Sequence, residues 1–589
     1  MKLLLRISSA KGTLSTLHKR PYSKYREEYE RAIQRPEDFW AEAAGRLVWD
    51  QKWNSVLKLN NGHDREWFVG GKMNITYNCL DRHVDENRGD YTAVIYDNPI
   101  NGKSCRLTYR QLLEQVELLS GVLIRKFGLK KHDRVVIYMP MINESLIAML
   151  ACARVGLIHC VVFGGFSESQ LALRIKHCQA NTLIMVNCSE RGDKMIDYTK
   201  IVEEALVKSE NLIDKCLVLN RDGYPKLEKF QNSQVSCKVY DWNEETSQSQ
   251  AHGPVSMDSM DPLYILYTSG TTGQPKGIVR SIGDYATALN WSMTNIYGCD
   301  SPLDTGKPVK PWWASSDLGW VVGHSYIAYA PLLAGIPTII YEGKPVGTPN
   351  ASQFFRLLSE YEVKSCFLTP SAIKSIRKVD PNLKESSKYL NYLDRTLKNV
   401  FLAGERCDHA TFVWIRDMLS SKIFIGDHWW QTESGWPLTA PCVGLHSNEE
   451  LGSIQIGSAG KAVPGYDIQT ISETEESEGS PEQTELQRIL IKSPMPPGFA
   501  KTLWNNDKLF KELYFDKYPG FYDTMDAGFV DEHDNVHIMS RCDDVINVNG
   551  QRLSSSALEE ACLAVENIVE CAVVPIDDDL KATGAKKTN

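Results

Sequence analysis

The segment best suited to chemistry is the run Tyr267-Thr-Ser-Gly-Thr-Thr-Gly-Gln-Pro-Lys-Gly277, which follows an apolar stretch at residues 263–266. Its glycines free the backbone to wrap around an anion, its hydroxyl side chains can donate hydrogen bonds, and Lys276 adds a positive charge. A P-loop requires the spacing GxxxxGKS or GxxxxGKT, whereas two residues separate the second glycine from the lysine here. The segment therefore predicts a phosphate-binding loop that is not a P-loop, with an ordinary turn rich in Gly, Ser and Thr as the alternative.

Five further segments join charged or aromatic side chains to glycines, and they follow one another along the chain. They are Ser315-Ser-Asp-Leu-Gly-Trp-Val-Val-Gly-His-Ser325, Ala403-Gly-Glu-Arg406, Asp427-His-Trp-Trp-Gln-Thr-Glu-Ser-Gly435, Tyr522-Asp-Thr-Met-Asp-Ala-Gly528 and Arg541-Cys-Asp-Asp-Val-Ile-Asn-Val-Asn-Gly-Gln-Arg552. Together with the loop around Lys276, they resemble in content and order the motifs of the adenylate-forming superfamily, which includes the acyl-CoA synthetases. The resemblance implies that a carboxylate is activated by ATP as an enzyme-bound acyl adenylate.

Two runs resemble one branch of that superfamily, the acetyl- and propionyl-CoA synthetases: Phe163-Gly-Gly-Phe-Ser167 and Trp429-Trp-Gln-Thr-Glu433. The likeness extends from about residue 29 to about residue 575. It implies an α/β fold, with a large adenylate-forming domain of parallel sheets flanked by helices and an incomplete small α+β domain after it. We expect a mitochondrial transit peptide at 1–26, an acetyl-CoA-synthetase-type segment at 27–97, an AMP-binding domain at 98–540 and a partial carboxyl-terminal domain at 541–589.

The resemblance also implies roles for single residues. Lys276 and Glu433 would act in catalysis, with Glu433 helping to hold Mg2+, which prefers oxygen ligands. Asp526 would accept hydrogen bonds from the ribose hydroxyls, and Asp543 would lie at the hinge between the two domains. The residues implied for ATP binding are Thr268, Ser269, Gly270, Thr271, Thr272, Gly404, Glu405, Arg406, Asp427, His428, Trp429, Trp430, Gln431, Thr432, Asp526, Arg541 and Arg552.

The acyl pocket implied by the resemblance has Trp430 at its end and Val321, Val322 and Ala403 as its other walls. Relatives specialised for acetate carry valine where this chain has Ala403, so we expect room for about one more methylene, a group worth ~1–3 kcal/mol in an apolar pocket. Propionate is therefore predicted to outcompete acetate, unless nearby side chains refill the space. For CoA, the resemblance points to Phe163, Gly164, Gly165, Arg191 and Lys194, although two basic residues in a polar loop are usually just solvated.

The elements that must position these residues alternate between strand and helix. Apolar strands are predicted at 134–139, 159–163 and 182–186, with helices at 144–155 and 171–178, and further strands follow at 365–368, 400–403 and 422–425. This order predicts parallel sheets with helices on their faces, and ligands that bind beyond the carboxyl ends of the strands. A helical region with Asp38 as its cap is predicted at 29–53, and an acidic surface loop at 472–486.

One uncharged stretch, residues 319–341, is long enough to span a bilayer. Pro331, Gly335 and Pro337 interrupt it, so we expect a buried helix followed by a strand at 338–341 instead of a membrane span. A net charge of −9 also argues against a nucleic-acid partner, so the expected partners are small molecules: the short-chain carboxylate, ATP and CoA. The 15 cysteines form no CxxC pair and are predicted to be buried, reduced thiols.

The sequences at both ends of the chain also lead to predictions. No acidic residue precedes Glu27 in a leader rich in Lys, Arg, Ser and Thr, which is typical of import into the mitochondrial matrix; a disordered basic tail is the alternative. At the other end, the family continues through a Gly-rich segment with a catalytic lysine, for which Lys586 and Lys587 lack the context. We therefore expect impaired adenylation in the chain as given, and keep two alternatives: a form that only binds nucleotide, and another adenylate-forming ligase.

Overall fold

The computed structural model of the chain describes residues 23–60, 64–191, 194–268, 275–472 and 486–548, followed by the short pieces 551–554, 558–559, 562, 571, 573–576 and 584–586. Two helices, α1 (Lys24–Gln34) and α2 (Pro36–Ala44), open the described part. The helical region predicted at 29–53 is confirmed as far as Ala44, where it consists of two helices, because Pro36 begins a new helix at a position where its missing N–H is tolerated. The predicted extension from 45 to 53 is wrong. Asp38 lies in the first turn of α2 and does not cap it.

The first large sheet has eight strands in the order β12-β11-β8-β6-β7-β14-β15-β25. Its ladders are parallel from β12 to β14, and β15 and β25 close one edge with antiparallel pairing. The strands and helices predicted between 134 and 186 are confirmed to within a few residues. The strands are β6 (Arg134–Tyr138), β7 (Ile158–Val161), β8 (Thr182–Val186), β11 (Lys215–Leu219), β12 (Lys238–Asp241), β14 (Pro262–Thr268), β15 (Lys276–Ser281) and β25 (Thr502–Leu503).

The second sheet has seven strands in the order β20-β19-β18-β16-β17-β4-β5, parallel except for the edge strand β5. The strand predicted at 422–425 begins two residues later and runs through Asp427, because its ladder with β19 pairs Asn399 with Phe424. The strands are β4 (Thr92–Asn98), β5 (Lys103–Thr108), β16 (Trp312–Ala314), β17 (Thr338–Tyr341), β18 (Ser365–Leu368), β19 (Asn399–Leu402) and β20 (Phe424–Asp427).

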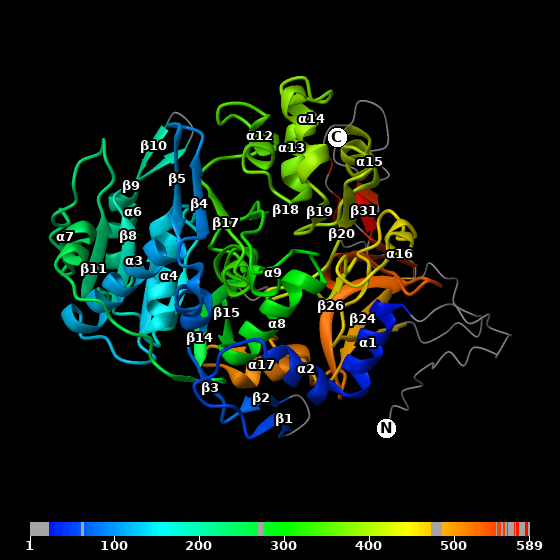
Figure 1. The fold of residues 1–589 in the computed structure, drawn as a ribbon, viewed down its shortest axis with the longest axis horizontal. Helices are drawn as coiled ribbons and strands as arrows, with labels where there is room; N and C mark the ends of the chain where they lie inside the picture. The colour runs from blue at the N-terminus through cyan, green and yellow to red at the C-terminus, as the bar shows by residue number, and fades with distance from the viewer. Residues whose placement is uncertain are drawn as a thin grey trace.

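Helices connect the parallel strands of both sheets, and Figure 1 shows α12, α13, α14 and α15 grouped over β18 and β19. The uncharged stretch at 319–341 is a buried helical region that leads into β17, as predicted, and no helix among the described residues is long and apolar enough to cross a membrane. The remaining helices are α3 (Tyr109–Gly121), α4 (Asn143–Arg154), α5 (Glu168–Cys178), α6 (Tyr198–Lys208), α7 (Trp242–Ser247), α8 (Gly283–Asn295), α9 (Pro302–Thr305), α10 (Val321–Gly323), α11 (Ala330–Leu333), α12 (Gln353–Glu360), α13 (Pro370–Val379), α14 (Ser387–Thr396), α15 (His409–Met418), α16 (Asn448–Gly452) and α17 (Asp507–Tyr514).

A third, antiparallel sheet has the order β23-β24-β26-β27. Helix α1 lies beside this part of the molecule (Figure 1), where the hydroxyl of Tyr25 donates to the carbonyl of Ala462 at 2.7 Å. The strands are β23 (Asp467–Ile471), β24 (Gln487–Lys492), β26 (Phe521–Val530) and β27 (Val536–Arg541). Two-stranded pairs complete the described structure: β1 (Ser55–Leu59) with β2 (Arg65–Val69), β3 (Lys72–Met73) with β13 (Met257–Asp258), β9 (Cys188–Arg191) with β10 (Lys194–Asp197), β21 (Thr439–Ala440) with β22 (Lys461–Ala462), β28 (Val545–Val548) with β29 (Gln551–Ser554) and β30 (Val574–Ile576) with β31 (Gly584–Lys586).

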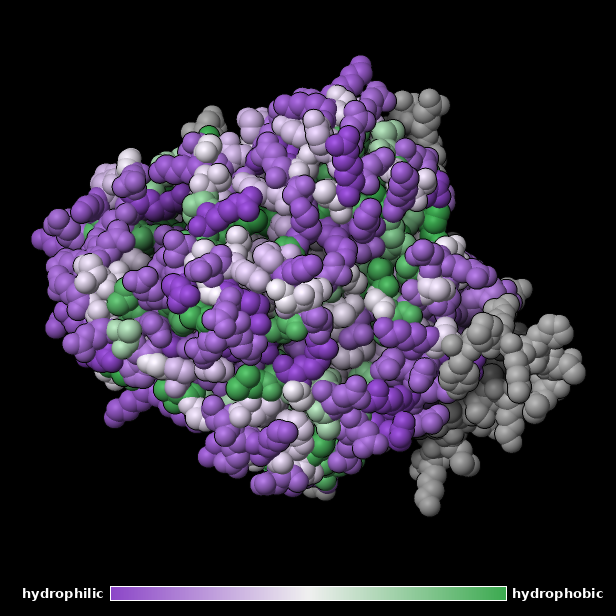
Figure 2. Space-filling view, in the orientation of Figure 1, coloured by the Kyte–Doolittle hydropathy of each residue, from purple (hydrophilic) through white to green (hydrophobic). Residues whose placement is uncertain are grey.

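The apolar core and the polar surface separate as expected for an α/β fold. One large cluster of buried side chains joins the first sheet to its helices, and a second packs under α12 to α15. Figure 2 shows mainly hydrophilic side chains on the viewed face, with scattered hydrophobic patches between them. The cysteines are free thiols and most of them are buried, which agrees with the sequence prediction. The predicted acidic loop falls largely on residues 473–485, outside the described part.

Candidate active site

The predicted phosphate loop connects two antiparallel strands whose ends are well defined. Thr268 ends β14, Lys276 begins β15, and these two residues pair with each other in the ladder. Four predicted residues, Ser269, Gly270, Thr271 and Thr272, lie outside the described part of the chain. The buried Oγ1 of Thr268 finds no hydrogen-bond partner among the described residues, so a polar atom is available where the loop leaves the sheet. A buried polar atom without a protein partner fits a site where a ligand supplies the hydrogen bond.

The side chains of Lys276 and Glu433 meet through a tyrosine. Lys276 Nζ donates to the hydroxyl of Tyr514 at 3.2 Å, and that hydroxyl donates to Oε1 of Glu433 at 2.5 Å. Tyr514 is the last residue of α17, and sequence reasoning missed it because no motif surrounds it. The structure thus brings together the two residues predicted to act in catalysis, although 157 positions separate them in the chain (433 − 276).

A buried arginine holds the loop that carries Glu433. Arg280 is fully buried in β15, and its guanidinium donates to the carbonyls of Thr432, Glu433 and Gly498. Gly435, with φ +76°, lies so close that a Cβ there would be 2.7 Å from Arg280 Cζ. Sequence reasoning also missed Arg280, even though it stands four residues after Lys276 in the same strand.

The predicted ribose ligand Asp526 lies beside two residues of the 427–435 motif. Its Oδ2 accepts hydrogen bonds from Trp429 Nε1 at 3.0 Å and Gln431 Nε2 at 2.6 Å, while Arg541 approaches Oδ1 at 3.9 Å. Burial raises the pKa of Asp526 to about 6, against the opposing effect of Arg541. The hydroxyl of Tyr522 completes this group by donating to Gln431 Oε1 at 2.8 Å.

The residues predicted to frame adenine come from the ends of β19 and β20. Gly404 has φ +108°, and only a Thr369 methyl approaches within 4 Å of a Cβ placed there. Burial raises the pKa of Asp427 to about 7. His428 is buried and bonded through both ring nitrogens, to the Leu402 carbonyl at 2.7 Å and the Tyr297 hydroxyl at 3.2 Å, so any contact with nucleotide would come from its main chain.

Glu405 and the predicted hinge residue Asp543 are exposed, and Arg406 is half-buried. Glu405 pairs with Lys374 at 3.5 Å, and Arg406 lies near enough to Asp427 to lower its pKa against the effect of burial. Asp543 accepts from Arg541 Nε at 3.3 Å. Arg552 pairs with Asn547 in β28 and β29, and its side chain lies outside the described structure.

The four predicted walls of the acyl pocket belong to one hydrophobic cluster. Ala403 is 3% exposed, directly follows β19, and belongs to the same buried cluster as Phe367 and Phe401. Trp430 sets its ring edge-on to Tyr326 at 5.5 Å, and Val321 and Val322 pack half-buried against the cluster. An apolar pocket that accepts only a short chain is consistent with this arrangement.

The residues predicted for CoA fall into two groups. Gly164 accepts a hydrogen bond from the Tyr198 hydroxyl at 2.9 Å, and a Cβ on it would lie 2.3 Å from that oxygen, so a larger residue would not fit. Phe163 packs on Trp320, which is 44% exposed. Arg191 and Lys194 face each other as backbone partners in the β9–β10 hairpin, and their side chains lie outside the described structure.

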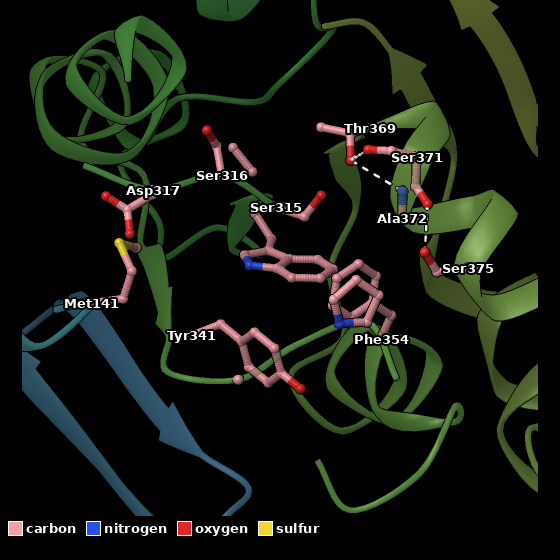
Figure 3. A pocket seen from close by; sticks show the side chains of 14 residues that line it. Met141, Ser315, Ser316, Asp317, Tyr341, Phe354, Thr369, Ser371, Ala372 and Ser375 are labelled. Atoms are coloured by element: carbon pink, nitrogen blue, oxygen red, sulfur yellow. Dashed lines mark hydrogen bonds between the residues drawn. The ribbon is translucent and has the colours of Figure 1, made fainter. Parts of the chain in front are cut away.

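A polar cavity of about 280 Å³ lies beyond the carboxyl ends of β16, β17 and β18 (Figure 3). Hydroxyl groups and one carboxylate surround it, over an aromatic floor that includes Tyr341 and Phe354. Burial raises the pKa of that carboxylate, Asp317, to about 6. The rule that ligands bind beyond strand ends located this region. Three of its polar lining residues, Ser315, Ser316 and Asp317, belong to a motif found in the sequence, whereas the sequence did not single out Thr369, Ser371 and Ser375.

Glu433 is the predicted metal-binding carboxylate at the phosphate end of the candidate site. No group of three or more His, Cys, Asp or Glu side chains in the described part of the chain could hold a metal ion by itself. Mg2+ commonly binds through one or two carboxylates together with substrate phosphates, so Glu433 fits an ion that arrives with a nucleotide.

Comparisons with known proteins agree with this geometry. Residues 80–498 match the family described as AMP-binding enzyme, and residues 25–79 match the one described as acetyl-coenzyme A synthetase N-terminus. The mitochondrial acyl-CoA synthetase short-chain family member 3 of Bos taurus is 45% identical over 564 residues, which cover 95% of this chain and 78% of that protein. A propionate–CoA ligase of Salmonella typhimurium is 36% identical over 563 residues, covering 95% and 85%.

The acetoacetyl-CoA synthetase from Streptomyces lividans has a similar structure, with a TM-score of 0.79 and 21% identity, covering 94% of this chain and 79% of that one. At that identity the likeness concerns the fold, and it confirms the predicted α/β adenylate-forming architecture. Because the AMP-binding model spans most of the chain and the relatives match over most of their own length, the chain belongs to the AMP-binding enzymes and, within them, to the short-chain acyl-CoA synthetases. The family implied by the motifs is confirmed, while the predicted domain boundaries and residue roles stay predictions.

Proposed function

We propose that this chain is a ligase that activates propionate, and acetate less readily. Carboxylate and ATP give acyl-AMP and pyrophosphate, and the CoA thiol then displaces AMP to give the acyl thioester and release its proton. The observation that carries this proposal is the pocket wall at Ala403, a small, buried residue in the same cluster as Trp430. The name of the Salmonella relative, a propionate–CoA ligase, supports the same substrate.

For the first step, the protein supplies position and charge. Lys276 and the loop before it would bind the phosphates, and Asp526 would hold the ribose through its carboxylate. Glu433 would hold Mg2+, whose chemistry is to neutralise charge on the phosphate oxygens. Fixed charges and dipoles of this kind act without reorganisation during the reaction, which is the usual source of large rate enhancements.

For the second step, CoA would enter along Phe163, Gly164 and Gly165. The polar cavity lies close to this path. Asp317 lines the cavity, and Gly319, two residues later in the same loop, is so near that a Cβ on it would lie 2.7 Å from the Phe163 backbone. Arg191 and Lys194, opposite each other in their hairpin, would meet the phosphates of the CoA nucleotide. A ligase that loads a carrier protein, or a form that only binds nucleotide, has less support, because the matched relatives are named as synthetases and a ligase.

We infer a mitochondrial location, in the matrix. The basic leader without an acidic residue before Glu27 supports it, and so do the mitochondrial names of the relatives. Residues 1–22 of that leader lie outside the described structure.

The pocket is tested with alkyl esters of AMP, whose ethyl and propyl forms imitate the adenylates of acetate and propionate. The protein is expected to bind the propyl ester at least about 10-fold more tightly than the ethyl ester, since one methylene in an apolar pocket is worth this much. Ala403→Val should remove most of that preference, and Trp430→Gly should admit the butyl and longer esters. Titration calorimetry measures each dissociation constant.

A matched control is Ala43→Val, at a residue of α2 that is 5% exposed and outside the pocket walls. This variant should keep the wild-type ratio even if it loses stability. An unchanged propyl-to-ethyl ratio in Ala403→Val would show that residue 403 does not set chain length, and the assignment to propionate would lose its physical basis.

A further inference from the structure

The hydroxyl of Tyr514 occupies the point where Lys276 and Glu433 meet. It accepts from Lys276 Nζ at 3.2 Å and donates to Glu433 Oε1 at 2.5 Å. A phenol has one proton to donate and lone pairs to accept with, so both contacts can form at once in one arrangement of hydrogens. Burial and the neighbouring Glu433 carboxylate raise the pKa of Tyr514 far above its ordinary value, which keeps that proton in place.

Packing, and not only these hydrogen bonds, fixes the position of the Tyr514 ring. Tyr514 is 2% exposed, and its ring lies 5.3 Å from Phe510 and 5.4 Å from the stacked ring of Tyr522. The ammonium of Lys276 also lies 5.5 Å from the ring centre. The hydroxyl of a ring held this way can fix the positions of the more flexible side chains of Lys276 and Glu433.

Tyr522 plays a parallel part on the ribose side. Its hydroxyl donates to Gln431 Oε1 at 2.8 Å, and the amide of Gln431 donates to Asp526. Two stacked tyrosines therefore reach the two ends of the predicted nucleotide site: Tyr514 reaches the residues expected at the phosphates, and Tyr522 reaches those expected at the ribose.

We propose that Tyr514 is a positioning residue for the triphosphate end of ATP. Its hydroxyl holds the ammonium of Lys276 and the carboxylate of Glu433 on either side of one point, ready to meet phosphate and the metal that accompanies it. Without the hydroxyl, the ammonium and the carboxylate are free to rotate or to pair with each other. Binding of ATP must then also fix the positions of both side chains, which costs affinity. This inference rests on the proposed function, since it assigns Lys276 and Glu433 to the phosphates.

The test compares Tyr514→Phe with Tyr522→Phe, because both keep the ring and remove one hydroxyl. Titration calorimetry with ATP and with AMP, each in excess Mg2+, gives two dissociation constants for each protein. Tyr514→Phe is expected to raise the dissociation constant for ATP about tenfold, the loss typical of one charge-assisted hydrogen bond. The dissociation constant for AMP should change by no more than about twofold. Tyr522→Phe is expected to weaken ATP and AMP by the same factor, because ribose is common to both.

A second measurement separates positioning from general damage. In a background of Glu433→Gln, the further change Tyr514→Phe should cost ATP affinity much less than it does in the wild type, because one of its partners is already altered. Equal losses for ATP and AMP in Tyr514→Phe, full additivity in the double variant, or an affinity for ATP that stays the same or rises would each overturn the inference. A wild-type protein that binds neither nucleotide would instead refute the proposed function.

Discussion

Asp526, the predicted ribose ligand, lies in a nearly closed environment. It is 5% exposed, and its pKa is raised to about 6 chiefly because burial disfavours the ionised form. Between pH 4 and 6 the folded protein keeps a proton here that the unfolded chain, with an ordinary pKa of 3.8, has lost. The free energy of unfolding therefore falls as pH rises through this window, and the loss persists above it. A negative charge on this predicted ribose ligand is therefore held at a cost in stability.

Asp526→Asn should remove that cost and the function together. The difference between 3.8 and about 6 corresponds to roughly 3 kcal/mol at most, so the melting temperature of the ligand-free variant should rise relative to wild type as pH goes from 5 to 7.5. The rise in melting temperature that ATP with Mg2+ gives the wild type should largely disappear. Differential scanning calorimetry at several pH values measures both effects.

Two results would oppose this account of Asp526. One is a difference in melting temperature between variant and wild type that does not change with pH. The other is an ATP-induced shift that Asp526→Asn retains in full, which would remove the residue from the nucleotide site.

At the scale of elements, strand β15 carries two residues that shape the candidate site. Lys276 stands at its first position, and Arg280 in its interior holds the carbonyls of Thr432 and Glu433. The strand therefore fixes the loop that carries the predicted metal carboxylate relative to the predicted phosphate lysine. A shift of either would change the distance that a triphosphate must span.

Arg280→Lys keeps the charge but loses the planar fork that reaches several carbonyls at once. We expect it to lower the free energy of unfolding by about 3 kcal/mol, as for other changes that leave buried polar groups unsatisfied, and to weaken ATP more than the loss of stability alone would. The control is Arg154→Lys, another fully buried arginine, paired with Asp81 at 2.7 Å and with Glu117. It should be destabilised similarly but bind ATP as the wild type does; urea unfolding and calorimetry compare the two.

If both variants lose ATP affinity equally, the effect belongs to general stability and Arg280 does not position the loop.

Much of the fold could be predicted because its local signals are strong. The strand at 182–186 is an apolar run and the helix at 171–178 an amphipathic stretch, and both were found within a few residues. The sequence could not say that β14 joins the first sheet and β16 the second, since strand pairing depends on contacts far apart in the chain. The separate α1 and α2 were missed because amphipathic spacing alone does not show where a proline restarts a helix.

The site was predictable where residues stand in a motif and not where they act alone. Asp526, Trp429 and Gln431 were expected together and are bonded to one another. Tyr514 contacts Glu433 across 81 positions, and Arg280 contacts it across 153, with no spacing that a periodic pattern could reveal. Only tertiary packing identifies such partners.

At the scale of the whole molecule, the two large sheets are joined near their strand ends. Arg221, just after β11 of the first sheet, donates to Glu342, just after β17 of the second, at 2.6 Å. Glu342 is 5% exposed, so this ion pair is a buried connection between the two halves. The candidate acyl residues and Glu433 come from segments that follow strands of these sheets, as expected for ligand sites in open α/β folds. Lys276 instead begins β15, and Asp526 lies in β26 of the third sheet.

The central claim is that these groups together form an acyl adenylate, and the most direct measurement is exchange of labelled pyrophosphate into ATP. The account predicts exchange that requires both propionate and Mg2+, that is weaker with acetate, and that Asp526→Ala abolishes, whatever its absolute rate. Exchange absent with every short-chain acid, in a protein that calorimetry shows to bind ATP, would contradict the claim and leave a protein that only binds nucleotide.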